Sequence, residues 1–189
     1  MYEKFGQFIN GKWSPSKNKE TYKVINPATE EVLGEASKAT PEDVEMALQS
    51  AKKGLQIWKK TPPWQRSYII RRIADKMREK QDVLAKWMTL EVGKPFAEAK
   101  GEVVGAADIF EWNAEETKRI YGQTVESRFE DTRVHVYYQP VGVVAALSPW
   151  NFPLVLSARK ISTALAAGCS VIIKPCLLYT SPSPRDKRQ

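Results

Sequence analysis

The sequence predicts an α/β fold that contains the start of an open, parallel, Rossmann-like sheet. Short strand and turn patterns fill residues 1–35, apolar residues recur at helical spacing over residues 41–120, and a strand–helix–strand pattern occupies residues 141–175. The chain has 189 residues, of which 42% are hydrophobic and 27% charged. This size and composition are typical of a globular chain with one domain, or one domain and part of another.

Two strand–turn–strand patterns precede the first expected helix. The dipeptide Asn10-Gly11 lies between apolar residues in the segment 7–13, and Asn-Gly is the strongest short-range hairpin signal. A similar pattern surrounds Asn26-Pro27 within residues 22–34. We therefore expect two short hairpins here.

The first helix is expected from Pro41 to about residue 58. Thr40 is a good N-cap, proline suits the first helical position, and Asp43 can complete a capping box. Pro62-Pro63 should end this element. Its helically spaced apolar residues predict a core stripe: Val44, Ala47, Leu48, Ala51, Leu55 and Trp58.

Two longer helices are expected next. One should run from about residue 64 to 92, with Gly93 as its C-cap. The other should begin after Pro95 and continue to about residue 120. Glycines at positions 101 and 105 predict close packing of this last helix against another backbone, because glycine has an unfavourable helix propensity.

A hairpin is expected at residues 124–140. Residues 133–139 alternate between apolar and polar side chains, as in an exposed edge or hairpin strand. His135 lies on the polar side of this strand, where a lone histidine is usually a surface residue. We assign it no catalytic role.

Residues 141–175 have the pattern of a βαβ crossover. The run 141–147 is continuously apolar, as in a buried parallel strand, residues 154–167 have helical composition, and residues 170–173 form a second β-branched run. Open parallel sheets bind ligands outside the carboxyl ends of their strands. Two segments are expected at such ends, residues 148–151 and residues 174–175.

Two side chains at these ends have suitable chemistry for an active site. Asn151 is a neutral amide donor that could stabilise an oxygen that becomes negative during a reaction, and Lys174 could meet ribose or phosphate oxygens. Spacing alone favours the alternatives, in which Asn151 caps the following helix and Lys174 is a solvated strand end. The usual Gly-x-Gly-x-x-Gly dinucleotide fingerprint is missing.

Composition argues against several other classes of protein. Two cysteines and one histidine provide neither a disulfide framework nor metal-ligand spacing. The net charge of +7 could indicate a nucleic-acid partner, but the basic residues are mixed with acidic ones, as on solvated helix faces. The longest apolar run is too short for a membrane span, and the first residues lack a secretory apolar core. We expect no metal, no nucleic acid, no membrane association and a cytoplasmic location.

Several short motifs are spread almost collinearly over residues 5–175: Ile9-Asn-Gly-Lys-Trp13, Asn26-Pro-Ala-Thr29, Glu91-Val-Gly-Lys-Pro95, Tyr138-Gln-Pro-Val-Gly-Val143, Pro149-Trp-Asn-Phe-Pro153, Ala164-Leu-Ala-Ala-Gly-Cys169 and Ile173-Lys-Pro175. In these motifs the chain closely resembles the NAD(P)-dependent aldehyde dehydrogenase superfamily, nearest to its succinate-semialdehyde dehydrogenase-like members. The resemblance covers residues 5–175. It implies the N-terminal part of the aldehyde dehydrogenase fold, with the hairpin as an oligomerisation element.

The resemblance also implies site roles. Asn151 would be the oxyanion-hole donor for the adduct between a cysteine thiolate and an aldehyde substrate. Hydride would pass to NAD or NADP, and a glutamate-activated water would hydrolyse the thioester. Lys174 would contact the adenosine ribose. The backbone that would line the cofactor cleft belongs to Leu147, Ser148, Pro149 and Trp150.

Arg159 suggests a class of substrate. It lies eight residues after Asn151 and is followed by Lys160, and succinate-semialdehyde dehydrogenases resemble this chain in carrying an Arg-Lys pair there. An arginine fork matches a carboxylate bidentately. The hypothesis is an aldehyde with a distal carboxylate, such as succinate or glutarate semialdehyde; a surface role or a cofactor contact for Arg159 remains the alternative.

After Pro175 the sequence leaves the family pattern. Residues 176–186 match the translation of a common transposase-type sequencing adapter, so we interpret residues 176–189 as a non-native tail that includes Cys176. Cys169 is expected to be a buried, inert thiol. The nucleophile and general base would then follow residue 175, and this chain would itself be inactive. The expected organisation is 1–123, N-terminal strands and helices; 124–140, hairpin; 141–175, first βαβ unit; and 176–189, tail.

Three classes of function follow from these observations. The first is an aldehyde dehydrogenase whose full-length parent is a homodimer or homotetramer that acts on a semialdehyde or on general aliphatic aldehydes. The second is an inactive chain that serves as an assembly module through its hairpin. The third, a basic nucleic-acid-binding protein, depends on net charge alone.

Overall fold

The structure, a computed structural model, describes residues 6–176. The expected tail therefore lies outside the described residues, apart from Cys176. The elements are β1 (Gln7–Ile9), β2 (Lys12–Ser14), β3 (Thr21–Ile25), β4 (Val32–Ser37), α1 (Pro41–Trp58), α2 (Pro63–Glu79), α3 (Gln81–Val92), α4 (Phe96–Glu116), η1 (Thr117–Arg119), β5 (Gln123–Glu126), β6 (Arg133–Val136), β7 (Val143–Ser148), α5 (Pro153–Ala166) and β8 (Ser170–Pro175).

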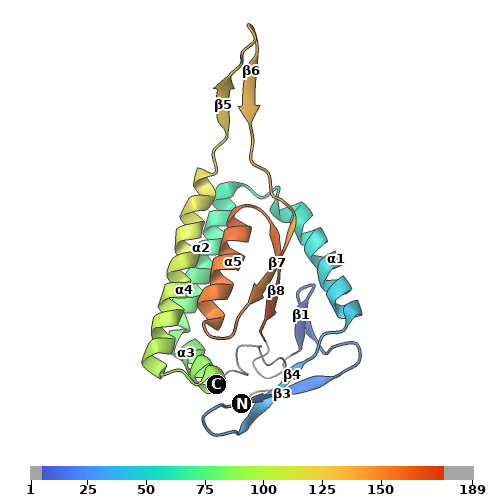
Figure 1. Cartoon of the computed structure of the whole chain (residues 1–189), viewed down its shortest axis with the longest axis vertical. Coiled ribbons are helices and arrows are strands. Elements are labelled where there is room, and N and C mark those ends of the chain that lie inside the picture. Colours follow the sequence, from blue (N-terminus) through green and yellow to red (C-terminus); the bar gives the residue numbers. More distant parts are fainter. Residues whose placement is uncertain (1–5, 177–189) are drawn as a thin grey trace, which may run out of the picture.

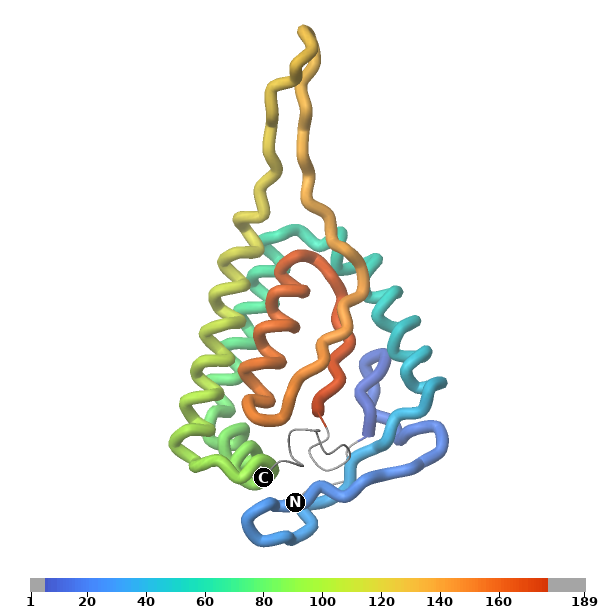
Figure 2. The backbone as a smooth tube through the Cα atoms, in the orientation of Figure 1, coloured from blue at the N-terminus to red at the C-terminus, as the bar shows by residue number. Residues whose placement is uncertain are grey.

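The helices cover both faces of a small parallel sheet. Helices α2, α3 and α4 pack together, α5 lies between this layer and strands β7 and β8, and α1 contacts the same strands from the other side (Figures 1 and 2). The β5–β6 hairpin projects away from this body (Figure 1). Within residues 6–176, none of the helices combines the length and apolar composition that a bilayer crossing requires. The arrangement confirms the predicted α/β class.

The N-terminal hairpins form where the turn residues predict them. Strands β1 and β2 pair antiparallel, and Asn10 and Gly11 between them have φ values of 55° and 75°. Two consecutive left-handed residues make a type I′ turn, which matches the right-handed twist of the strands. Strands β3 and β4 also pair antiparallel, with a register shift at Val24/Ile25.

Helix α1 begins at the predicted cap but packs differently from the prediction. The Thr40 hydroxyl accepts from the Asp43 backbone N–H (3.3 Å), and the Asp43 carboxylate accepts from the Thr40 backbone N–H (2.9 Å). Its predicted core stripe is only partly buried, and Val44 is 57% exposed. The reason is that α1 lies at the side of the fold, packed mainly against β7 and β8, so little partner surface covers its apolar stripe. Trp58 anchors it, donating from Nε1 to the carbonyl of Leu165 (2.9 Å).

The expectation of a single helix at residues 64–92 is wrong, because the helix is interrupted at Lys80. This residue has φ −102° and ψ 19°, outside the helical region, and it ends α2 and precedes α3. No glycine or proline marks the break. Tertiary packing explains it: α3 turns to pack against α4, where Gln81 Nε2 donates to the carbonyl of Lys100 (3.2 Å). The predicted C-cap is confirmed, since Gly93 has φ 77° and donates to Thr89.

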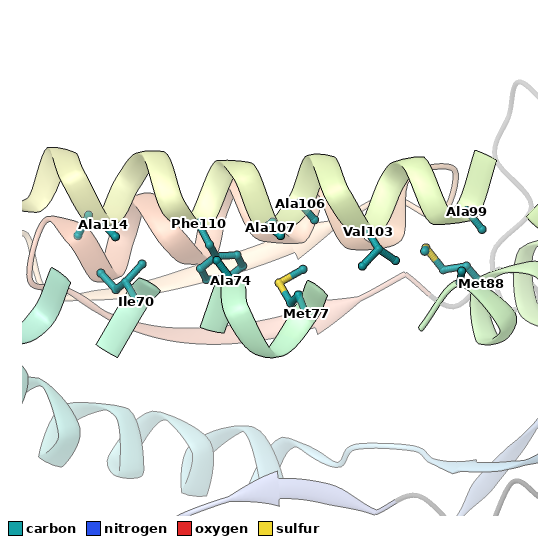
Figure 3. Close-up of a cluster of buried hydrophobic side chains, with 13 residues drawn as sticks. Ile70, Ala74, Met77, Met88, Ala99, Val103, Ala106, Ala107, Phe110 and Ala114 are labelled. Carbon is teal, nitrogen blue, oxygen red and sulfur yellow. The ribbon is translucent and has the colours of Figure 1, made fainter. Parts of the chain in front are cut away.

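The main hydrophobic core lies where α4 crosses α2, α3 and α5. Figure 3 shows one stripe of α4 facing side chains of α2 and α3. The labelled members are Ile70, Ala74, Met77, Met88, Ala99, Val103, Ala106, Ala107, Phe110 and Ala114. The many alanines on α4 let the helix axes approach closely, which holds α5 and the strand beside it in a defined position.

Close packing against another backbone was predicted at both glycines of α4, Gly101 and Gly105, and neither position shows it. A Cβ at Gly105 would lie 3.7 Å from Val155 Cγ2 of α5, an ordinary contact with a side chain rather than a backbone. A Cβ at Gly101 would meet nothing within 4 Å, so the packing predicted there is wrong. Gly168 has a clearer role. Its φ is 85°, and a Cβ there would lie 2.9 Å from Pro140 Cγ, so glycine permits the sharp turn from α5 into β8.

The βαβ crossover has the predicted topology. Strands β7 and β8 pair parallel from Val143↔Ser170 to Ser148↔Pro175, with α5 between them in the chain. The expectation that residues 141–147 are fully buried is wrong, because Val141 is 90% and Leu147 62% exposed. Among the described residues this sheet has two strands, so β7 is an edge strand.

Helices α2 and α4 are also joined by a network of ion pairs. Arg71 contacts both Glu111 and Glu115, and Arg78 pairs with Asp108 (2.8 Å) and Glu111 (2.5 Å). Hydrogen bonds from Lys118 and Arg71 lower the pKa of Glu115 from 4.5 to about 2. A carboxyl whose pKa is depressed by folding stabilises the folded state above its unfolded pKa.

We expect Glu115→Gln to reduce resistance to urea at pH 7 and to have a progressively smaller effect below pH 4.5. Glu115 contributes stability above pH 4.5, its unfolded value, and that contribution is lost as the pH falls toward 2. Urea unfolding at pH 7, 4.5 and 3 measures it. Glu98→Gln, at an exposed position in the first turn of the same helix, is the control. A difference that stays constant across this range would contradict the prediction.

Candidate functional site

The predicted site segments lie side by side at the carboxyl ends of the two parallel strands. Leu147 pairs with Lys174, and Ser148 pairs with Pro175. Asn151 follows β7 by three residues and precedes α5, which begins at Pro153. The structure therefore brings together the 148–151 segment and the end of β8 at one edge, as expected for an open parallel sheet.

Asn151 is exposed and does not cap the helix. The N-cap residue of α5 is Phe152, and no side chain of the capping residue bonds the helix end. This rules out the alternative in which Asn151 is a helix cap. Its backbone is held instead, since the carbonyl of Asn151 accepts from Lys94 Nζ (3.1 Å). Within residues 6–176 its side-chain amide has no hydrogen-bond partner and is free to donate.

A carboxylate from α4 caps α5 in place of a local residue. Glu102 Oε1 accepts from the backbone N–H groups of Leu154 (2.9 Å) and Val155 (3.1 Å). Glu102 Oε2 accepts from Lys94, whose Nζ lies 4.2 Å from the centre of the Phe152 ring. Both charged side chains are largely buried, at 2% and 11% exposure. An anion at a helix N-terminus satisfies free amides and the positive end of the helix dipole.

Sequence reasoning missed this ion pair. Lys94 was noted only as part of a family motif, and Glu102 was not singled out. A signal was present, because Glu102 lies on the apolar stripe of α4 beside Ala99 and Val103. A charged residue at a core position is rarely buried without a partner.

The residues expected to line the cofactor cleft differ in orientation. Ser148 is buried, and its hydroxyl accepts from the Ser157 hydroxyl of α5 (2.9 Å), so its side chain faces the helix. Side chains alternate along a strand, which directs Leu147 and its partner Lys174 to the opposite face. Pro149 and Trp150 are exposed. A ligand at this edge could reach the Ser148 backbone but not its hydroxyl.

The two cationic site residues have no ion-pair partner in the described part of the chain. Lys174 is exposed at the end of β8. Arg159 is exposed on α5, and no carboxylate among residues 6–176 lies within ion-pair distance of it. At the helical rise it lies roughly 9 Å along the axis from Pro153. The structure thus places Arg159 on the helix that follows Asn151, without a contact between them.

The two cysteines lie at different ends of β8. Cys169 is 3% exposed and precedes the strand, whereas the site lies at its carboxyl end, roughly 20 Å away for six residues. It is too deep and too distant to act beside Asn151. Cys176 is exposed and follows β8 directly, but it belongs to the segment interpreted as non-native.

His135 is exposed on the β5–β6 hairpin, where its Nδ1 atom lies 3.2 Å from the Thr124 hydroxyl oxygen.

Comparisons with known proteins agree with this geometry. The model of the family described as "Aldehyde dehydrogenase family" matches residues 13–180, which includes five residues of the expected tail. Glutarate-semialdehyde dehydrogenase of Pseudomonas putida is 48% identical over 89% of this chain and 35% of its own length. Succinate-semialdehyde dehydrogenase [NADP(+)] of Escherichia coli is 46% identical over 88% of this chain and 35% of its own length.

The fold also matches a solved structure. A crystal structure of an E. coli NADP-dependent enzyme superposes with a TM-score of 0.89 at 45% identity, covering 91% of this chain and 36% of that chain. The chain thus spans about 35% of the length of the curated relatives it matches. The matched part contains the βαβ unit and the edge that presents Asn151.

Proposed function

Because the chain belongs to the aldehyde dehydrogenase family, we propose that the full-length parent oxidises an aldehyde to a carboxylic acid. The reaction would pass through a cysteine thiohemiacetal and a thioester, with a nucleophile that follows residue 175. Members of this family use NAD or NADP. The observation that carries the proposal is the exposed amide of Asn151, held by its backbone beside the carboxyl ends of β7 and β8.

Asn151 would stabilise the substrate oxygen during attack. The aldehyde oxygen gains negative charge when a thiolate adds to the carbonyl carbon. A neutral amide N–H directed at this oxygen stabilises the charge without moving a proton. Because the Asn151 carbonyl is already bonded to Lys94, the backbone need not reorganise when the charge develops.

The residues at the sheet edge fit a dinucleotide. Lys174 is an exposed cation without an ion-pair partner among the described residues, and it lies next to Leu147 across the parallel strands. Its ammonium group would hold ribose or phosphate oxygens, while the backbone of residues 147–150 lines the cleft. When bound, the cofactor supplies a hydride acceptor. The orientation of Ser148 toward α5 leaves its backbone, rather than its hydroxyl, for this role.

Arg159 would select an aldehyde that carries a distal carboxylate, such as succinate or glutarate semialdehyde. Two similar relatives are named for these semialdehydes. The Arg159 guanidinium is exposed on α5 and is not engaged by a carboxylate of the described chain, so its donors are available to a ligand. A general aliphatic aldehyde dehydrogenase is the alternative, and substrate selectivity separates the two.

Arg159→Ala in the full-length parent should lower kcat/KM for succinate semialdehyde by about 10- to 100-fold, because hydrogen bonds to charged groups contribute about 1.5–3 kcal/mol. Activity toward butanal, an uncharged aldehyde of similar length, should be nearly unchanged. Steady-state kinetics with both substrates measure this. Lys160→Ala removes the neighbouring exposed cation of the same helix and is the matched control. An equal loss of kcat/KM for both substrates, or an equal loss in Arg159→Ala and Lys160→Ala, would reject the role of Arg159 in binding a substrate carboxylate.

The β5–β6 hairpin is proposed to join subunits of the parent into a homodimer or homotetramer. All eight strand residues are exposed, and the hairpin extends away from the body (Figure 1). Val125, Val134 and Val136 are among its exposed apolar side chains. We propose that the 189-residue chain is catalytically inactive. Its exposed hairpin favours a second function, in which this chain pairs with a full-length subunit. Co-purification of the two chains tests this.

A further inference from the structure

We propose that the buried pair Lys94–Glu102 is a positioning device for the oxyanion-hole asparagine, an inference that rests on the function proposed above. The pair touches four residues of the segment that carries Asn151. Lys94 bonds the carbonyl of Asn151 and lies over the Phe152 ring, and Glu102 accepts the amides of Leu154 and Val155. Neither side chain contacts the Asn151 amide group.

The geometry gives each charge a separate task. Helix α5 has no capping side chain of its own, so its first turn would leave amides without acceptors if Glu102 were absent. Glu102 belongs to α4, whose stripe forms the main core. Glu102 therefore ties the start of α5, and with it the end of the Asn151 loop, to the helix that forms the main core.

Lys94 serves both as tether and as counter-charge. A lone carboxylate near the oxyanion site would oppose the negative charge that develops on the substrate, and the ion pair cancels that field. The same ammonium also holds the Asn151 carbonyl (3.1 Å). Lys94 follows Gly93, the C-cap of α3, so the end of one helix and the middle of another together fix the loop.

The test uses the full-length parent and the variant Lys94→Met. Loss of the tether should lower kcat by about 10²-fold, the scale expected when a catalytic group is misplaced by about 1 Å. The affinity for NAD or NADP should change little. Lys94→Arg keeps the charge and the donors but is larger and planar, so it should recover part of the lost kcat rather than all of it. Lys100→Met is the matched control. Lys100 also pairs with a carboxylate, Asp82 (2.8 Å), and lies 5.7 Å from a phenylalanine ring, Phe96, but among the described residues it makes no hydrogen bond to the Asn151 loop.

A double variant separates positioning from general structure. If Lys94 acts through Asn151, then Lys94→Met should lower kcat by less than about threefold in an Asn151→Ala background, because there is no amide left to position. A merely structural role would multiply the two losses and would overturn the proposal. Lys94→Met/Glu102→Gln removes both charges while keeping an acceptor for α5. It should fold and still show a reduced kcat, which addresses loss of folding in the single variant.

Hydrogen exchange distinguishes failure of this inference from failure of the proposed function. Amides in residues 150–156 should exchange at least about tenfold faster in Lys94→Met than in wild type or Lys100→Met. Unchanged exchange would overturn the positioning role whatever the enzyme does. Wild-type protein that oxidises no aldehyde, yet shows the faster exchange in Lys94→Met, would reject the dehydrogenase assignment and keep the ordering role of the pair.

Discussion

Asn151→Ala in the full-length parent is expected to lower kcat by about 10²- to 10³-fold, the effect of removing one oxyanion-hole donor. The amide is exposed at the carboxyl edge of the sheet and has no hydrogen-bond partner among the described residues, so its loss should remove no structural contact of the fold. The affinity for the nicotinamide cofactor, NAD or NADP, and the thermal midpoint should stay close to wild type. Steady-state kinetics, fluorescence titration of the cofactor and thermal unfolding measure the three quantities.

Gln49→Ala is the control for loss of an amide. Gln49 is exposed on α1, and within residues 6–176 its side chain bonds only its helical neighbour Glu45 (2.6 Å), so kcat should not change. Asn151→Asp provides a second check. It preserves the shape but replaces a donor by a negative charge, and it should lower kcat at least as far as alanine does. Wild-type kcat in Asn151→Ala would remove the oxyanion role and, with it, the main support for the mechanism.

Phe110→Ala is expected to lower the free energy of unfolding by about 3–5 kcal/mol, the usual range for a buried phenylalanine. Phe110 is 5% exposed and belongs to the same buried cluster as Ala74 of α2 (Figure 3). Its neighbours on this stripe are alanines, which cannot expand to fill the space. A loss of this size is a large part of the stability of an ordinary domain.

The matched control lies two residues further along the same helix. Trp112 is 70% exposed, and Trp112→Ala should change the free energy of unfolding by less than about 0.5 kcal/mol. Urea unfolding followed by far-ultraviolet circular dichroism measures the free energy of unfolding of the two variants and of the unsubstituted protein. Similar losses of unfolding free energy in Phe110→Ala and Trp112→Ala would contradict the prediction. They would show that the α2–α4 interface does not form the stabilising core.

The site edge could be predicted because its signals are local or topological. The type I′ turn at Asn10-Gly11, the capping box at Thr40 and the glycine cap at Gly93 are each encoded within a few residues and are confirmed. The βαβ unit follows from a change in apolar periodicity, and parallel pairing then requires the ends of β7 and β8 to meet. Asn151 and Lys174 could be assigned to one edge on that basis.

The errors occurred where contacts distant in sequence override local preference. Lys80 breaks a helix without a glycine or proline, because α3 turns to pack on α4. The apolar stripe of α1 predicts burial, yet Val44 is mostly exposed. Periodicity shows which face of a helix is apolar, but not how much partner surface will cover that face.

The sequence by itself determined the α/β class, the order of the elements and the edge at which Asn151 appears, because periodicity, turn residues and chain connectivity specify these locally. Only the tertiary structure decided what holds that edge in place. Lys94 and Glu102 are separated from Asn151 by 57 and 49 residues, and their contacts with the loop form only after α3, α4 and α5 have packed. A buried ion pair depends on burial and on the distance between its charges, and both are properties of the packed helices rather than of any local stretch of sequence.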